Sequence, residues 1–183
     1  MRKWIKWSMA GVATLGALAL LVVPKAATSA LPVGAKAPDF TTRGAIAGKL
    51  FTLTLSDQLK KGPVVLYFFP AAFTPGCTAE AHEFAEATDD FKAAGATVIG
   101  MSADPVDKLA RFSTEECRDK FAVASAGPSS VNDYDVAIPF SGMTNRTSYV
   151  IAPTGRIAYV HSAMSYKDHV KNTLAAVKSI GGQ

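Results

Sequence analysis

The chain has 183 residues, a length typical of one domain, and nearly half of them are apolar, so a packed core can form. Its formal net charge is +4, but residues 1–30 hold four of the 19 basic residues and no acidic one, which leaves 15 of each sign. Residues 31–183 therefore have no excess of basic residues, and the lack of a basic excess argues against a surface that binds nucleic acid.

The first thirty residues have the layout of an export signal. Basic residues at positions 2, 3 and 6 precede an apolar run from Met9 to Val23, and small residues follow up to Ala30. The run is shorter than the roughly 20 residues that span a bilayer. Counting back to Trp7 narrows that gap, so an uncleaved anchor in the inner membrane is the alternative. Both interpretations place the folded domain, residues 31–183, outside the cytoplasm, in the periplasm or another exported location.

Residues 31–48 are rich in Gly, Pro and Ala and are expected to form an entry segment. The segment Leu50–Leu55 alternates like a half-buried strand. Pro63–Phe69 is continuously apolar, which is typical of a central strand covered on both faces.

A helix is predicted over residues 77–92. Its apolar face would be formed by Ala81, Phe84, Ala85, Thr88 and Phe91, and the acidic residues Glu80, Glu83, Glu86 and Asp90 would lie away from it. Gly95 is expected to close this helix, and residues 96–102 read as the next strand.

Asp104 and Pro105 predict the start of another helix, with Asp as N-cap and Pro at the first helical position, running to about Arg118. Strands are predicted over 146–151 and 156–161, joined by a turn, and a closing helix over 165–180. This order predicts an α/β domain with a mixed central sheet and helices on both faces, and a thioredoxin-like arrangement fits it.

The start of the helix at residue 77 is the strongest candidate for chemistry. Pro70 ends the preceding strand because it cannot donate to a sheet ladder. Thr74 and Pro75 suit the N-cap and the first helical position. Cys77 then falls in the first turn, where free N–H groups and the helix dipole favour an anion. The position predicts a reactive thiolate; a buried, inert cysteine is the structural alternative.

The stretch FFPAAFTPGCTAE, Phe68–Glu80, resembles the active-site signature P-x-x-x-T-x-x-C of the peroxiredoxins. Its TPGCTAE form is most similar to the bacterioferritin comigratory protein, or peroxiredoxin Q, branch. The resemblance covers residues 33–180 and includes GAKAPDF, VIGMSADP and RTSYVIAPTGRI. In the last of these, Arg146 stands in the position of the family's active-site arginine.

The resemblance implies a thioredoxin-like thiol peroxidase that uses no metal, haem or flavin. Cys77 would attack the terminal oxygen of hydrogen peroxide or an organic hydroperoxide and become a sulfenic acid. Thr74 would hold the peroxide, Pro70 would shield the site, and Arg146 would favour the thiolate and the polarised O–O bond. A thioredoxin-type protein or a small thiol would be the reductant, and the chain would be a monomer or weak homodimer.

Each role has a simpler alternative. Thr74 can be only an N-cap, Pro70 only a strand terminator, and Arg146 only a solvated charge at a strand end. Glu80 can pair with Arg146 or merely complement the helix N-terminus. The sequence leaves the choice between the two roles of Glu80 open.

Two other regions carry weaker signals. His161 and His169 are expected to be surface or packing residues. Residues 137–145, AIPFSGMTN, can line the peroxide entrance or form a dimer contact. Nothing in the sequence chooses between these two possibilities.

Cys117 is the second cysteine of the chain. Many members of the branch have a second cysteine five residues after the first, but here that position is His82. The resemblance therefore leaves Cys117 as the residue that resolves the sulfenic acid. Its helical spacing from Leu109 also suits simple packing. Resolution would require either the turn around Cys77 or the polar end of the second helix to unwind.

Two other classes of function fit parts of the sequence. An exported binding module would use Cys77 and Cys117 as a static disulfide, but such a bridge needs none of Pro70, Thr74 and Arg146. A thiol–disulfide oxidoreductase is disfavoured because the sequence has no C-x-x-C pair. The leading prediction is a thiol peroxidase.

Overall fold

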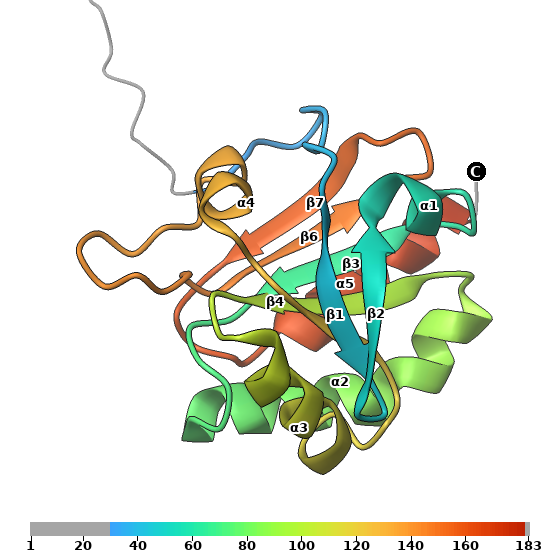
Figure 1. The fold of residues 1–183 in the computed structure, drawn as a ribbon. Coiled ribbons are helices and arrows are strands. Elements are labelled where there is room, and N and C mark those ends of the chain that lie inside the picture. Colours follow the sequence, from blue (N-terminus) through green and yellow to red (C-terminus); the bar gives the residue numbers. More distant parts are fainter. Residues whose placement is uncertain (1–29, 182–183) are drawn as a thin grey trace, which may run out of the picture.

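The computed structural model describes residues 30–181 (Figure 1). The predicted signal peptide or anchor lies outside the described residues, apart from Ala30. No helix in residues 30–181 is long and apolar enough to cross a membrane. The elements are β1 (Thr41–Ile46), β2 (Lys49–Thr54), α1 (Leu55–Leu59), β3 (Val64–Phe68), α2 (Pro75–Ala93), β4 (Thr97–Ser102), α3 (Val106–Glu115), β5 (Ala122–Ser125), α4 (Pro128–Asp133), β6 (Thr147–Ile151), β7 (Ile157–Ser162) and α5 (His169–Gly181).

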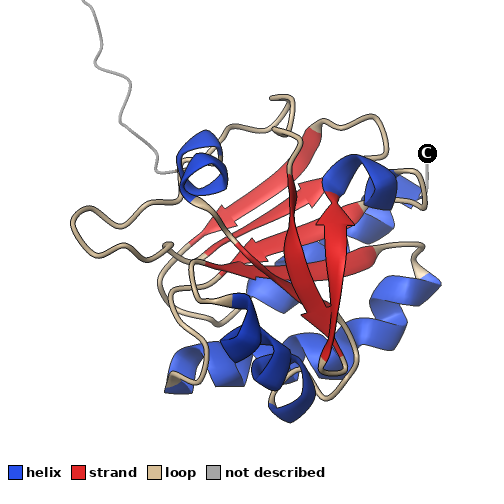
Figure 2. Ribbon diagram, viewed as in Figure 1, coloured by secondary structure: helices blue, strands red, loops and turns tan. Residues whose placement is uncertain are grey.

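The strands form one mixed sheet in the order β2-β1-β5-β4-β3-β6-β7 (Figure 2). β3 and β5 both pair parallel with β4, whereas the other neighbouring strands are antiparallel. All residues of β3 are buried. The predicted central strand and mixed sheet are therefore confirmed.

The side chains of β3 divide the core between the two faces of the sheet. Val65 and Tyr67 pack with residues of α2, α3 and α5, and the Tyr67 ring stacks on Phe84 of α2 at a centroid distance of 4.3 Å. Leu66 and Phe68 pack with α1 and with the segment that follows α4. Helices therefore cover both faces, as predicted.

Four short elements differ from the expectation. β1 lies within the predicted entry segment, where Gly44 interrupts the apolar pattern. A Cβ on Gly44 would lie 3.1 Å from the carbonyl oxygen of Val123, so glycine lets β1 pack closely against β5. α1, β5 and α4 were not predicted because each has only four to six residues and no clear periodicity. Leu55, predicted to end a strand, begins α1.

The two helix starts differ in how far they match the prediction. α2 begins at Pro75 after Thr74, as expected. α3 begins one residue later than predicted, with Pro105 at the N-cap. It ends at Glu115 rather than Arg118, because Arg118 and Asp119 have φ values of 51° and 60°, in the left-handed region. Cys117 therefore lies in the turn after α3.

The register of β6 against β3 places an arginine beside the start of α2. β6 runs antiparallel to β3, and Phe68 lies opposite Thr147. Arg146 immediately precedes Thr147 and therefore lies at the sheet edge where the chain leaves β3 for α2. The Thr144 hydroxyl donates to the carbonyl oxygen of Phe69 at 2.7 Å and ties the two segments together.

Candidate active site

Cys77 lies in the first turn of α2, beyond the carboxyl end of β3, and its side chain is only 2% exposed. Binding sites in open α/β sheets occur at this edge. A Cβ on the preceding residue, Gly76, would lie 3.3 Å from Nη2 of Arg146. The glycine therefore leaves room for the guanidinium beside the helix start.

The loop between β3 and α2 is held by Asp104, which the sequence predicted to be an N-cap. Its Oδ2 accepts hydrogen bonds from the Ala72 N–H at 2.7 Å and the Ser102 hydroxyl at 2.8 Å, and its Oδ1 pairs with Lys108 at 2.7 Å. Burial disfavours the Asp104 charge, but these donors hold the pKa of its carboxyl below its usual value. Asp104 thus anchors the loop as an acceptor.

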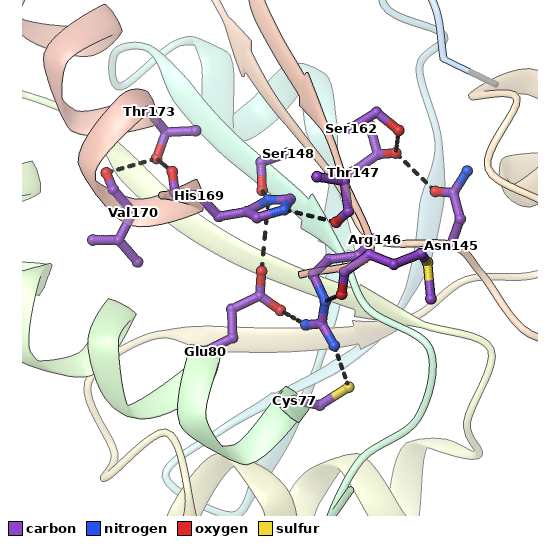
Figure 3. A network of polar contacts seen from close by, with 12 residues as sticks. Cys77, Glu80, Asn145, Arg146, Thr147, Ser148, Ser162, His169, Val170 and Thr173 are labelled. Atoms are coloured by element: carbon purple, nitrogen blue, oxygen red, sulfur yellow. Dashed lines mark hydrogen bonds and ion pairs between the residues drawn. The ribbon is translucent and has the colours of Figure 1, made fainter. Parts of the chain in front are cut away.

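Arg146 is buried and makes three contacts (Figure 3). Its Nη2 lies 3.4 Å from Cys77 Sγ, its Nη1 forms an ion pair with Glu80, and its Nε donates to the Met164 carbonyl oxygen at 3.0 Å. Burial opposes the positive charge, but Glu80 and Cys77 outweigh it and raise the pKa of Arg146. The alternative of a solvated charge is therefore wrong.

Glu80 was predicted to lie away from the buried face of its helix, and this is wrong. It follows Cys77 by three residues on α2 and is fully buried, because its carboxylate turns inward to pair with Arg146. Of its two predicted alternatives, the pairing with Arg146 is the one observed. Burial raises the pKa of Glu80 despite the neighbouring guanidinium.

His169, at the start of α5, is a site residue that sequence reasoning missed. It is fully buried: Nδ1 lies 2.7 Å from Ser148 Oγ and 3.7 Å from Glu80 Oε1, and Nε2 lies 3.0 Å from the Ala163 carbonyl oxygen. Burial lowers the pKa of His169 to about 4. His161 packs edge-on against the His169 ring at 4.4 Å, as a packing residue would.

Thr74 and Pro70 lie in the loop that leads to Cys77. Thr74 is the N-cap residue of α2, yet its hydroxyl donates to the Ala71 carbonyl oxygen at 2.9 Å instead of accepting from a helix N–H. The hydroxyl is therefore not used to cap the helix. Pro70 lies two residues after the end of β3. The carbonyl oxygen of Phe69, the residue between them, accepts a hydrogen bond from the Thr144 hydroxyl.

Cys117 is fully buried in the same apolar cluster as Cys77, and both are free thiols. Burial, with the charges of Glu116 and Asp119 nearby, raises the pKa of the Cys117 thiol well above its usual value. In this conformation Cys117 is therefore a protonated packing residue.

The segment after α3, the polar end expected to unwind for resolution, is joined to α2 by three contacts between polar side chains. Nε2 of His82 lies 2.8 Å from Glu116, and Arg118 lies 3.3 Å from Glu86. Lys120 lies 3.8 Å from Asp89. The partners on α2 recur every three to four residues, so they share one face of that helix.

The segment 137–145 carries the fully exposed Phe140. Residues 137–140, 142 and 143 line a cavity of about 430 Å³ together with Ala103, Ala126 and residues of α4. Neither Cys77 nor Arg146 belongs to that lining. The structure leaves both predicted roles of this segment open.

Sequence reasoning found Cys77 and Arg146 because they belong to recognisable local motifs. Ser148 and His169 belong to none, and their contact joins β6 to α5 over a separation of 21 residues. The available signals were a serine in the middle of a buried strand and a glutamate one turn after Cys77. Together, these residues can hold an anionic sulfur beside a fixed cation at a helix start.

Comparison with known proteins shows which proteins this chain is similar to. The profile of the AhpC/TSA family matches residues 33–160. The chain is 30% identical to peroxiredoxin Q, chloroplastic, of Oryza sativa subsp. japonica over 90% of this chain and 82% of the relative. It is 29% identical to peroxiredoxin Bcp of Bacillus subtilis over 82% of this chain and 97% of that relative. The structure of peroxidoxin BcpB from Mycobacterium tuberculosis matches with a TM-score of 0.73 and 32% identity, over 82% of this chain and 98% of that one.

Proposed function

Since the chain belongs to the AhpC/TSA family, on its peroxiredoxin Q and Bcp branch, and is a thiol-dependent peroxidase, we propose that Cys77 is the thiol that reduces the peroxide. One observation carries this assignment: the buried guanidinium of Arg146 lies 3.4 Å from Cys77 Sγ at the start of α2. A cation and a helix N-terminus both favour a thiolate, which is the nucleophilic form of cysteine. At Cys117, by contrast, burial and the charges of Glu116 and Asp119 disfavour a thiolate.

The reaction is a nucleophilic displacement on oxygen. The Cys77 thiolate attacks the terminal oxygen of a hydroperoxide, an S–O bond forms, and the O–O bond breaks. The sulfur is oxidised by two electrons, and the leaving oxygen takes a proton and departs as water or an alcohol. The Arg146 guanidinium stabilises the negative charge that develops on the leaving oxygen.

Thr74 and Pro70 have supporting roles in this proposal. The Thr74 hydroxyl is exposed and caps no helix N–H, and it exchanges its hydrogen bond to the Ala71 carbonyl oxygen for one to the bound peroxide. Pro70 limits the access of water to the loop beside Cys77. Hydrogen peroxide and organic hydroperoxides are both proposed substrates.

Cys117 resolves the sulfenic acid in our proposal. Its sulfur attacks the oxidised sulfur of Cys77, an S–S bond forms, and water leaves. A thioredoxin-type protein or a small thiol then reduces the disulfide. Two features support a mobile Cys117: it lies in a turn and not in a helix, and the left-handed conformations of Arg118 and Asp119 cost about 1 kcal/mol each, which release of the turn would recover.

Location and assembly are also proposals. The basic, apolar and small-residue parts of residues 1–30 support export to the periplasm or a similar compartment, with an inner-membrane anchor as the alternative. We propose a monomer or weak homodimer.

Peroxide consumption by the purified protein tests the assignment of Cys77. With dithiothreitol as reductant, the wild type is expected to consume hydrogen peroxide over many turnovers, and Cys77→Ser is expected to be inactive. Cys117→Ser should retain the first turnover, since it keeps the peroxide-reacting thiol. Activity in Cys77→Ser would refute the assignment.

A further inference from the structure

Two acidic side chains, Cys77 and Glu80, share one guanidinium inside the core (Figure 3). The three groups are almost completely excluded from solvent. If both acids were ionised, a single cation would face two anions away from water, which is an unfavourable arrangement. One anion beside the Arg146 cation is the favoured state, so one of the two acids keeps its proton.

His169 is the polar side chain that faces the free oxygen of the Glu80 carboxyl. Its Nε2 lies 3.0 Å from a carbonyl oxygen, that of Ala163, which can only accept, so Nε2 carries a hydrogen. Nδ1 of a neutral imidazole is then an acceptor. It lies 2.7 Å from the Ser148 hydroxyl and 3.7 Å from Oε1 of Glu80. Oε1 is buried and has no hydrogen-bond partner among the described residues.

We propose that Glu80 keeps a proton on Oε1, which faces Nδ1 of the neutral His169, while Cys77 is a thiolate, which makes His169 a positioning residue for the peroxide reaction. The ionisation of Cys77 then leaves the total charge of the buried site unchanged. The S–H bond of Cys77 breaks and an O–H bond forms on Glu80. Arg146 keeps one anionic partner before and after the transfer.

The titration behaviour of the pair agrees with this geometry. Burial raises the pKa of Glu80 and lowers that of His169 to about 4, so a protonated carboxyl beside a neutral imidazole is favoured near neutral pH. A second anion would be stabilised only by a second cation.

The surrounding groups supply no second buried cation within the described residues. The titratable or charged groups that act on the pair are Glu83 of α2, Tyr67 of β3, Arg146 before β6 and His161 of β7, while Lys167 and Asp168 before α5 act on Glu83. Burial raises the pKa of Tyr67, so its phenol stays neutral. Arg146 is therefore the cation for which Cys77 and Glu80 compete.

The test measures how fast iodoacetamide alkylates Cys77 between about pH 4.5 and 9, with Cys117→Ser as the parent so that a single thiol reacts. The variants are Glu80→Gln, His169→Ala and the double variant E80Q/H169A, each checked for folding by circular dichroism. The proposal rests on Cys77 as the reacting thiol. Alkylation needs no peroxide turnover, so this proposal and the assignment of Cys77 as the peroxide-reacting thiol can fail separately.

The three variants have distinct expected results. E80Q keeps this position in the uncharged form proposed for Glu80, so alkylation near pH 6 should stay within about twofold of the parent. H169A removes the acceptor for the Glu80 proton, so Glu80 ionises more readily and alkylation near pH 7 should be about threefold slower. In the E80Q background, H169A should change nothing further, because His169 acts only through Glu80.

Equal effects of H169A in both backgrounds would overturn the proposal and make His169 a purely structural residue. Alkylation of E80Q near pH 6 that is about threefold faster or more would also overturn it, because Glu80 would then be a competing anion in the parent. If H169A does not fold, Ser148→Ala takes its place. Without that hydroxyl, Nδ1 is available to accept from the protonated Glu80, so alkylation near pH 8, where Glu80 begins to ionise, should rise only when Glu80 is present. An unchanged rate would contradict the proposal.

Discussion

Arg146 contacts Cys77, Glu80 and the Met164 carbonyl oxygen at the same time, and a lysine cannot reproduce all three contacts. We expect Arg146→Lys to lower the second-order rate constant for hydrogen peroxide by about 100-fold. Rapid-mixing kinetics measures this constant. The control is Arg156→Lys, because Arg156 is exposed and its Nη1 donates to the Gly34 carbonyl oxygen, away from Cys77. Equal rate constants for the two variants would contradict the role of Arg146.

The Thr74 hydroxyl gives a second prediction for a single residue. Thr74→Val is expected to slow the peroxide reaction by about tenfold or more because it removes a donor to the bound peroxide. Thr74→Ser should restore the rate. Since the hydroxyl makes no cap hydrogen bond, the free energy of unfolding of Thr74→Val should change by less than about 1 kcal/mol. A large loss of stability without a loss of rate would show that Thr74 only supports the helix start.

The local part of the site could be predicted from sequence, and its long-range part could not. Cys77, Thr74 and the loop between them fall in one stretch, and Arg146 was found through the resemblance. Helical periodicity predicted that Glu80 lies on the solvent face. The contact that buries it comes from Arg146, 66 residues away. The pairing of His169 with Ser148 depends equally on the tertiary fold.

Between elements, the ion pairs from α2 to the turn after α3 should control how often Cys117 becomes accessible. We expect Glu116→Gln, which weakens the pair with His82, to speed alkylation of Cys117 by N-ethylmaleimide about two- to fivefold in a Cys77→Ser background. Surface ion pairs are weak, so the effect is modest.

The matched control is Glu115→Gln. Glu115 pairs with Arg111 on the same helix and does not bridge to α2, so its loss should leave the Cys117 alkylation rate unchanged. Equal acceleration by both variants would show that general loss of negative charge, and not the contact with α2, exposes Cys117.

The elements that sequence predicted well are those with strong periodicity or continuous burial. β3, α2 and the hairpin of β6 and β7 were predicted with small errors in their ends. β5 was missed because its buried residues are mostly small and its four positions give no alternation. The end of α3 was missed because left-handed backbone at Arg118 and Asp119 has no glycine to announce it.

For the whole molecule, His169 should make stability depend on pH. The pKa of His169 is about 4 in the folded protein, against a reference value of 6.5. Between these two pH values the unfolded chain therefore binds a proton that the folded protein excludes. The free energy of unfolding should therefore fall as the pH is lowered through this window. Glu80 acts in the opposite direction: its raised pKa gives stability at low pH that is lost as the pH rises.

Urea unfolding of the wild type and His169→Gln at several pH values separates these contributions. The stability difference between them should shrink as the pH falls from about 6.5 to about 4. Thr173→Val, which removes a buried hydroxyl on the same helix and no titratable group, serves as the control, and its difference from the wild type should not follow this pattern. A difference for His169→Gln that stays constant with pH would contradict a neutral, buried His169.

The central claim, that Cys77 takes the oxygen from the peroxide and Cys117 resolves it within the chain, is tested most directly by intact mass. After one equivalent of hydrogen peroxide without reductant, the wild type should lose about 2 Da as a disulfide, and Cys117→Ser should gain about 16 Da, located on Cys77 by peptide mapping. Cys77→Ser should be unchanged. Oxidation of Cys77→Ser to the same extent would contradict Cys77 as the reacting thiol, and a disulfide-linked dimer of the wild type would contradict resolution within the chain.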